Sequence, residues 1–228
     1  MTDWTKVLAI IFDMDGVFVD TEPIVFTVFR RVFDPMGIYL SDDYQFKFIG
    51  KPTPKNLQDI ERDFGITLDK NAIIQKLKKT YQKVLNETEL HPQPGIRGLI
   101  NWAQKNDRRL GLCTTSPRSD VDAVFEKLNR NDSKYNPDKL FNAVVTGNDV
   151  THKKPHPEPY RKVIERMNAV PDSCVVFEDS LSGIRSAKAA GCTCVGIRRF
   201  YNRHIDFFEA DEVLSVEDFS ELGHKLSG

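Results

Sequence analysis

Two aspartates one residue apart, Asp13 and Asp15, directly follow a short apolar run near the amino terminus. The run, Val7 to Phe12, predicts a buried strand, which would place both carboxylates at the sheet edge where ligands bind in open α/β folds. Two like charges held this close favour a bound cation, a shared proton or a reaction. For an isolated pair of this kind, the alternative is a turn with one capping aspartate.

Polar side chains also follow three later apolar runs. Thr114, Thr115 and Ser116 follow the run at 110–113, Lys154 lies beyond the run at 143–146, and Glu178 and Asp179 follow the run at 174–177. Each group alone has an ordinary alternative, as a helix cap or as a solvated lysine. Because the carboxyl ends of parallel strands meet at one sheet edge, we expect these groups around a single site.

Such a site has the residue types that phosphoryl transfer needs. Carboxylate oxygens are suitable ligands for Mg²⁺. A hydroxyl, a lysine ammonium and N–H groups at helix starts would hold the oxygens of a phosphoryl group. A nucleophilic carboxylate can form an aspartyl phosphate.

The elements that would position these residues divide the chain in two. Apolar runs at 7–12, 110–113, 143–146, 174–177 and 192–197 predict strands, and they alternate with helical periodicity from about residue 95, which predicts an α/β fold with a parallel sheet covered on both faces. Residues 20–90 carry helical signals instead, at about 21–36, 41–48, 53–65 and 69–87. We predict a core of residues 1–18 and 92–228, an inserted all-helical domain of residues 19–91, and a polar loop at 129–138.

Composition and charge narrow the classes of function. A formal net charge of −1, with no block of like charge, disfavours a nucleic-acid partner. The longest apolar runs, about six residues, are too short to span a bilayer, and the amino terminus makes a poor signal peptide. The four cysteines are expected to be buried free thiols in a reducing cytoplasm, and Cys192 and Cys194 lack the second pair of ligands that a zinc site needs. We therefore predict a cytoplasmic protein without a membrane partner.

Four segments, in order along the chain, resemble the motifs of the haloacid dehalogenase-like (HAD) hydrolase superfamily: DMDGVFVDTEP, LCTTS, KKPHPEP and VVFEDSLSGI. Within it, FDMDG, KPHPEPY and FEDSLSGI are similar to the branch that contains β-phosphoglucomutase and many sugar-phosphate phosphatases. The resemblance spans essentially the whole chain. It implies a Rossmann-like parallel sheet with a helical cap domain inserted after the first motif, and Mg²⁺ as cofactor.

The resemblance also implies a role for each motif residue. Asp13 would be the nucleophile, and Asp15 would protonate the leaving oxygen and then activate water. Thr114, Thr115 and Lys154 would hold the phosphoryl oxygens. The metal ligands would be Asp13, Asp15 through its carbonyl oxygen, and Asp179, with Glu178 as an additional or water-bridged ligand. Family members that dehalogenate lack the second aspartate, so Asp15 favours phosphoryl transfer.

In this family the cap sets the substrate. The candidate substrate-contacting residues are Asp20, Thr21, Glu22, Val25, Phe48, Gly50, Lys51 and Thr53. Val25 stands near a position where β-phosphoglucomutases carry a histidine, and lysines at 51 and 55 stand where those mutases carry a phosphate-binding arginine. We therefore expect a monomeric phosphatase acting on a small phosphomonoester, such as a sugar phosphate, through an aspartyl phosphate. A hexose phosphate mutase is the alternative, and a non-catalytic phospho-ligand-binding protein is a minor one. The cap is expected to rock about linkers near 17–21 and 88–94.

Overall fold

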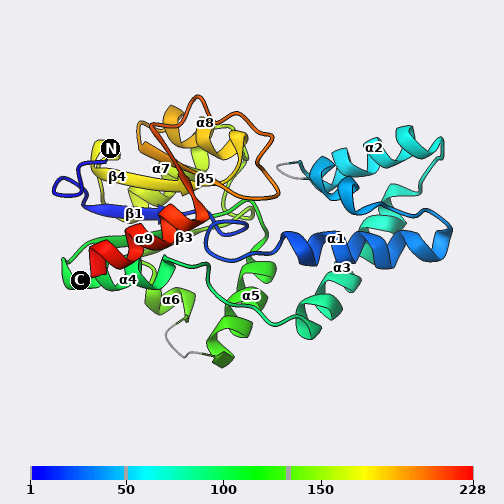
Figure 1. Ribbon diagram of the computed structural model, residues 1–228, viewed down its shortest axis with the longest axis horizontal. Helices are drawn as coiled ribbons and strands as arrows, with labels where there is room; N and C mark the ends of the chain where they lie inside the picture. The colour runs from blue at the N-terminus through cyan, green and yellow to red at the C-terminus, as the bar shows by residue number, and fades with distance from the viewer. Residues whose placement is uncertain (1, 49–50, 132–134, 228) are drawn as a thin grey trace. The chain divides into compact units, whose positions relative to one another are not determined.

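The computed structural model describes residues 2–48, 51–131 and 135–227 (Figure 1). The chain separates into two compact units, Met1–Asp20 with Leu90–Gly228, and Thr21–Glu89. The first unit holds a β-sheet with its covering helices. The second unit is a helical segment inserted into the first.

The sheet of the first unit has six parallel strands. They are β1 (Ala9–Phe12), β2 (Arg109–Cys113), β3 (Ala143–Val145), β4 (Cys174–Glu178), β5 (Thr193–Arg198) and β6 (Glu212–Ser215). Their order across the sheet is β3-β2-β1-β4-β5-β6, and each neighbouring pair is parallel. The strand order reverses between β1 and β4, and sheets of this kind bind ligands beyond the carboxyl ends of the strands at that point.

Helices cover both faces of this sheet (Figure 1). Helices α7 (Glu158–Arg166) and α8 (Leu181–Ala189) pack on one face, against β2, β3 and β5. Helices α4 (Ile96–Lys105) and α9 (Val216–Ser227) pack together on the other. Helices α5 (Arg118–Asn131) and α6 (Pro137–Leu140) connect β2 to β3. Because both faces are covered, β1 and β4 are buried along their whole length and read as continuous apolar runs.

Alternate residues of the central strands face the two helical layers. Ile11 and Val176 belong to the cluster that packs under α7 and α8. Phe12 and Phe177 face the other way and stack with their ring centroids 5.7 Å apart, and Phe177 lies 5.1 Å from the ring of Phe219 on α9. Burying a large apolar side chain contributes about 1.5–3 kcal/mol, so this packing makes the sheet a firm support for the polar residues at its edge.

Among its described residues, the second unit consists of helices joined by loops. It contains α1 (Glu22–Phe33), the 3₁₀ helices η1 (Asp34–Met36) and η2 (Asp42–Lys47), α2 (Thr53–Phe64) and α3 (Lys70–Glu87), and α1 packs against α3. Gly37 and Gly65 end two of these helices in the left-handed conformation, which glycine adopts without strain. Asp69 caps α3 by accepting a hydrogen bond from the Ala72 N–H.

The predicted α/β fold with a helical insertion is confirmed, including all five predicted strands. Strand β6 was not predicted from the sequence, because this short edge strand is only partly buried and has no apolar run. The predicted segment at 41–48 is a 3₁₀ helix. The predicted loop at 129–138 is wrong at both ends, since α5 continues to Asn131 and α6 begins at Pro137.

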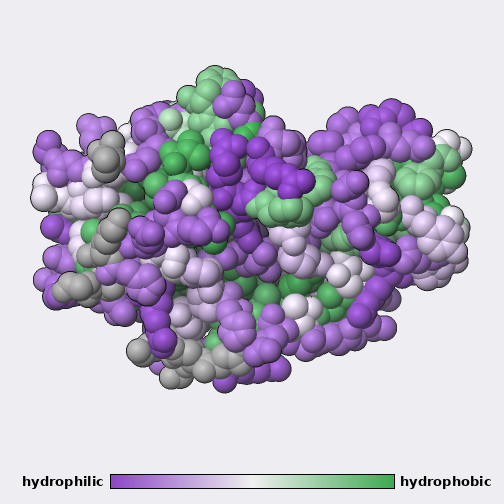
Figure 2. Space-filling view, viewed as in Figure 1, coloured by the Kyte–Doolittle hydropathy of each residue, from purple (hydrophilic) through white to green (hydrophobic). Residues whose placement is uncertain are grey.

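The surface and the cysteines agree with the composition. All four cysteines are buried and free, as predicted. The face in Figure 2 is mostly hydrophilic, with smaller hydrophobic areas. Among the described residues, none of the helices has both the length and the apolar character needed to cross a bilayer.

Candidate active site

An acidic cluster lies at the carboxyl ends of β1 and β4, the two strands at which the sheet order reverses. Asp13 follows β1 directly, Glu178 is the last residue of β4, and Asp179 follows it. One carboxylate oxygen of each lies within 4.8 Å of the others. All three side chains are largely buried. The sheet therefore places here the carboxylates that the sequence analysis expected at one edge.

Two glycines allow the loops to approach this cluster closely. A Cβ atom on Gly16 would lie 1.8 Å from Oδ2 of Asp179, and one on Gly183 would lie 1.9 Å from Oε1 of Glu178. Gly16 also has a φ of +82°, which other residues rarely adopt. The turn after β1 and the start of α8 can close around the carboxylates only because these positions lack side chains.

Lys154 is the cation of this cluster. Its ammonium donates to Oδ1 of Asp13 at 2.6 Å, to Oε1 of Glu178 at 2.6 Å and to the Cys113 carbonyl at 2.8 Å. Only 4% of the side chain is exposed. The ammonium also lies 4.8 Å from the centre of the Tyr160 ring. Lys154 therefore ties together the ends of β1, β2 and β4.

Burial and mutual attraction perturb the titration of this cluster. Burial raises the pKa of Asp13 to about 8, with the attraction of Lys154 opposing the shift and the negative charge of Glu178 adding to it. Burial works against the charge on Lys154, but the neighbouring Asp13 and Glu178 carboxylates outweigh it and raise the lysine pKa above its ordinary value. Lys154 is thus a permanent cation, and Asp13 keeps a proton near neutral pH until another cation stabilises its ionised form.

Asp15 is held by hydroxyl groups from the end of β2. Its Oδ2 accepts a hydrogen bond of 2.7 Å from Ser116 Oγ and a longer one of 3.4 Å from Thr114 Oγ1. The same Thr114 hydroxyl accepts the Ser116 backbone N–H at 3.0 Å. The hydroxyl cluster after β2 therefore orients Asp15, and Ser116 is the closest member, which the site prediction left out. Thr115 lies beside this group, and its carbonyl accepts a hydrogen bond from Lys153.

Glu178 has hydrogen bonds on both carboxylate oxygens. Oε1 accepts from Lys154 and, at 2.6 Å, from the Tyr160 hydroxyl, while Oε2 accepts from the Asp179 N–H, the Ser180 N–H and the Ser180 hydroxyl at 3.1–3.3 Å. A carboxylate has about four lone-pair positions, so these five donors leave no oxygen of Glu178 open without breaking a bond. In the sequence, Tyr160 stands at the end of the segment KPHPEPY, and no role was predicted for its hydroxyl.

The residues fit a hard divalent cation. Asp13 and Asp179 are side chains with oxygen donors at the sheet edge, and the turn at Gly16 lies close against the Asp179 carboxylate. The donors are all oxygen atoms, as Mg²⁺ prefers. Glu178, with its oxygens already bonded, supports Lys154 and the loop rather than offering an open position.

A second group of metal-ligating side chains, His152, His156 and Glu158, is a poorer fit. Nδ1 of His156 accepts the Glu158 N–H at 3.2 Å, which puts the proton of the neutral ring on Nε2 and closes that atom to a metal. The Glu158 carboxylate is used by the N–H groups of Thr151 and His152. These bonds instead fix the loop that presents Lys154.

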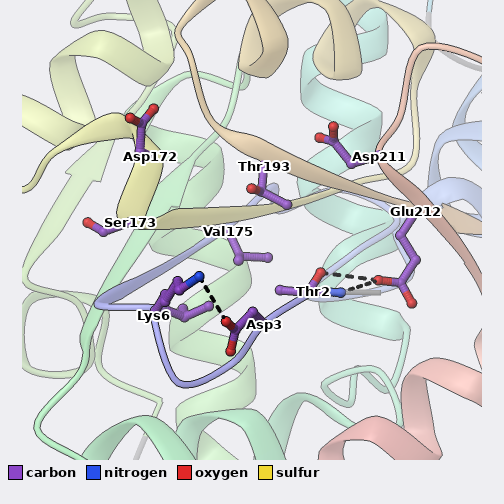
Figure 3. Close-up of a pocket in the computed structure, with 10 residues that line it drawn as sticks. Thr2, Asp3, Lys6, Asp172, Ser173, Val175, Thr193, Asp211 and Glu212 are labelled. Atoms are coloured by element: carbon purple, nitrogen blue, oxygen red, sulfur yellow. Dashed lines mark hydrogen bonds and ion pairs between the residues drawn. The ribbon is translucent and has the colours of Figure 1, made fainter.

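A cavity of about 260 Å³ lies at the opposite, amino-terminal edge of the sheet (Figure 3). Thr2, Asp3, Lys6, Asp172 and Glu212 are among its lining residues. Two pairs of its polar groups bond to one another: Asp3 forms an ion pair with Lys6, and Thr2 donates to Glu212. It has no part in the carboxylate cluster.

The candidate substrate-contacting residues of the inserted unit lie at the start of α1 and close to α2. Thr21 directly precedes α1, and Glu22 is the first residue of that helix. The Lys51 ammonium donates to Oδ2 of Asp59 at 2.8 Å, and Asp59 also accepts from Arg62. Gly50 lies outside the described residues.

The parallel sheet with its helical layers and the acidic cluster at the carboxyl ends of β1 and β4 define an α/β protein with a carboxylate site at the edge of its sheet. The model of the family described as haloacid dehalogenase-like hydrolase matches residues 10–197, and the chain belongs to this family. A phosphorylated carbohydrates phosphatase from Thermotoga maritima is 35% identical over 187 residues, covering 80% of this chain and 81% of that protein.

Solved structures agree with this assignment. CbbY from Rhodobacter sphaeroides in complex with phosphate is 27% identical, with a TM-score of 0.80, covering 95% of this chain and 96% of that one. A CbbY variant from the same organism, in complex with xylulose-(1,5)bisphosphate, has the same identity and coverage, and a TM-score of 0.79. The chain is thus a phosphatase of the HAD-like hydrolase family.

Proposed function

We propose that this protein is a Mg²⁺-dependent phosphatase that hydrolyses a phosphomonoester of a small carbohydrate through an aspartyl phosphate. The observation that carries the proposal is the joint contact of Lys154 with Asp13 and Glu178 at the carboxyl ends of β1 and β4. The similarity to a phosphorylated carbohydrates phosphatase and to a CbbY structure in complex with xylulose-(1,5)bisphosphate supports this substrate class.

Each residue of the cluster has a distinct part in the proposed reaction. Asp13 attacks phosphorus, and Lys154 stabilises the charge that develops on the phosphoryl oxygens. Thr114 and Thr115 lie at the end of β2, where they would contribute hydrogen bonds to the phosphoryl group. Asp15, oriented by Ser116, protonates the leaving oxygen and then takes a proton from the attacking water.

Asp13, the Asp15 carbonyl and Asp179 would hold Mg²⁺, with Glu178 in an indirect role. When bound, the ion would neutralise part of the negative charge of the carboxylates and of the phosphoryl group. The inserted unit is the candidate cap, and we propose that it contributes Thr21, Glu22, Gly50 and Lys51 to substrate selection.

Phosphate release from a panel of phosphorylated compounds tests the proposal. The panel contains pentose and hexose monophosphates, sugar bisphosphates, and non-carbohydrate phosphomonoesters, each assayed with Mg²⁺ and with chelator. We expect Mg²⁺-dependent release, highest among the carbohydrates. Asp13→Asn should abolish it, whereas the matched control Asp172→Asn, an exposed aspartate at the other end of the sheet, should retain it. Substantial activity in Asp13→Asn would refute the mechanism.

A separate assay distinguishes the mutase. β-Glucose 1-phosphate is supplied with a bisphosphate primer, and both free phosphate and the isomerised product are measured. Free phosphate alone supports the hydrolase. Isomerisation without net phosphate release would replace the proposed function by a hexose phosphate mutase.

A further inference from the structure

The loop after β5 carries two buried polar residues, Arg199 and Asn202, outside all four sequence motifs. Arg199 is 9% exposed and Asn202 is 1% exposed. The Asn202 side-chain oxygen accepts the Arg199 backbone N–H at 2.6 Å, so the two residues form one unit. Both side chains reach back toward the loops that carry the acidic cluster.

Arg199 holds the turn that follows β1. Its Nη1 donates to the carbonyl of Gly16 at 2.7 Å, and its Nη2 lies 2.6 Å from Oδ2 of Asp20. With the Gln93 amide turned so that its oxygen faces the guanidinium, that oxygen accepts from the same two nitrogens at 3.2 and 2.8 Å. One planar, permanently charged group therefore fixes both chain segments that lead from the first unit into the insertion.

Asn202 holds the other loop of the cluster. Its amide nitrogen donates to the carbonyl of Asp179 at 2.8 Å and to the carbonyl of Ile197 at 2.9 Å. Together with the bond accepted from Arg199, these hydrogen bonds join the Asn202 side chain to the main chain of its own loop, of β5 and of the Asp179 loop. Asn202 therefore fixes the position of the Asp179 main chain relative to the carboxyl end of β5.

The two segments that Arg199 and Asn202 hold, the Gly16 turn and the Asp179 loop, lie in close contact. Gly16 and Asp179 approach so closely that a Cβ on Gly16 would overlap the Asp179 carboxylate. The segments that carry them, after β1 and after β4, are far apart in sequence. A shift of either loop by a fraction of an ångström changes the spacing of the oxygens that face a cation, and Mg²⁺ demands near-ideal geometry.

We propose that Arg199 and Asn202 are positioning residues that set the divalent-cation affinity of the site by fixing the Gly16 turn against Asp179. The inference rests on the proposed function, since it concerns the cation used in that reaction. Neither side chain touches the cation or the substrate. Their contribution is to keep the ligand spacing in place before the cation arrives.

The test measures cation binding directly, without turnover. Binding of Mn²⁺, a spectroscopic substitute for Mg²⁺, is titrated by electron paramagnetic resonance in wild type, Arg199→Met, Arg199→Lys and Asn202→Ala. Loss of one hydrogen bond from a charged donor, or of two from a neutral amide, corresponds to roughly a tenfold or larger change in an equilibrium constant. We expect Arg199→Met and Asn202→Ala to bind Mn²⁺ at least about tenfold more weakly, and Arg199→Lys, which keeps one donor and the charge, to bind with intermediate affinity.

Arg198→Met is the matched control, because Arg198 sits next in sequence but donates to the carbonyls of Arg203 and Ile205 and lies over the Phe207 ring, at 5.2 Å from its centre. It should bind Mn²⁺ like wild type. In phosphatase assays, Arg199→Lys should need more Mg²⁺ for half-maximal rate, while its substrate KM at saturating Mg²⁺ stays that of wild type. A merely structural role would not separate these two parameters.

The outcomes are distinguishable. Thermal unfolding in chelator identifies variants that fail to fold, and Arg199→Lys, which keeps the buried charge, then decides the question. Unchanged Mn²⁺ affinity in folded Arg199→Lys and Asn202→Ala would overturn the positioning role while leaving the phosphatase intact. A wild-type protein that binds no Mn²⁺ and releases no phosphate would instead refute the proposed function.

Discussion

Replacing Lys154 by methionine should destabilise the protein as well as inactivate it. The lysine ammonium has three protein acceptors within 2.8 Å, and two of them are the carboxylates of Asp13 and Glu178. The Glu178 side chain is 1% exposed and that of Asp13 is 11% exposed, so water cannot replace the lost cation. Methionine has nearly the same length, so the change removes mainly the charge and its donors.

The magnitude follows from the burial of these partners. Removing one member of a buried ion pair typically costs about 3–5 kcal/mol, because the remaining charge has lost its partner. The hydrogen bonds to Glu178 from Tyr160 and from the Ser180 loop remain, and Asp13, whose pKa burial raises to about 8, already carries a proton near neutral pH, so Glu178 is the main charge left without its partner. We therefore expect a loss of about 3 kcal/mol in the free energy of unfolding, at the lower end of that range.

Urea unfolding in chelator, followed by circular dichroism, measures this loss. Lys153→Met is the matched control, since the neighbouring lysine is exposed and makes one long contact to the Thr115 carbonyl. The double variant Lys154→Met/Glu178→Gln removes the uncompensated charge and should recover part of the stability but none of the activity. A loss below about 1 kcal/mol, together with no recovery in the double variant, would refute the assigned charge balance.

Three further predictions concern the same cluster. In chelator, the stability of wild type relative to Asp13→Asn should fall as pH rises from 4 to 8. Burial raises the pKa of Asp13 from 3.8 to about 8 in the folded protein, so protonated Asp13 contributes its full stabilisation below pH 3.8 and loses it as the pH rises through 8. If the free energies of unfolding of the two proteins, measured with urea, changed in parallel with pH, the prediction would be contradicted. Ser116→Ala should lower kcat about tenfold with KM unchanged, because Asp15 loses its 2.7 Å hydrogen bond, and an effect on KM alone in steady-state kinetics would assign Ser116 to binding. Tyr160→Phe keeps the ring but removes the 2.6 Å bond to Glu178, and should cost about 1.5–3 kcal/mol in urea unfolding; a loss under 0.5 kcal/mol would show that the other donors compensate.

The apolar runs were sufficient to predict the central strands, because a strand buried on both faces has no polar positions to interrupt it. The edge strand β6 escaped for the opposite reason. Glu212 and Val213 lie on a partly exposed edge, so β6 is held by pairing with β5 rather than by a buried apolar run. Helix α6 escaped because its cap, Asn136, lies within a polar stretch typical of a loop.

The same contrast holds for the site. Residues at the ends of strands could be placed together from the sequence, because the topology brings strand ends to one edge. The contributions of Tyr160 and Asn202 could not be predicted from the sequence, because they depend on the direction in which a side chain points from a helix or a loop. Arg199 follows the fifth strand, at the same edge as the motif residues, so the strand-end argument could have found it.

The charges of the cluster explain why Lys154 is shared between two carboxylates. Glu178 is the fixed partner, since five donors hold its oxygens and keep it in place. With Asp13 and Asp179 ionised, the three carboxylates exceed the charge of Lys154 by two, which one divalent cation would balance. In the proposed reaction the Asp13 carboxylate becomes an acyl phosphate and loses its own charge, while the phosphoryl group brings new charge to the same place. Lys154 can follow that charge without leaving Glu178 or the Cys113 carbonyl, so little reorganisation is needed during the step.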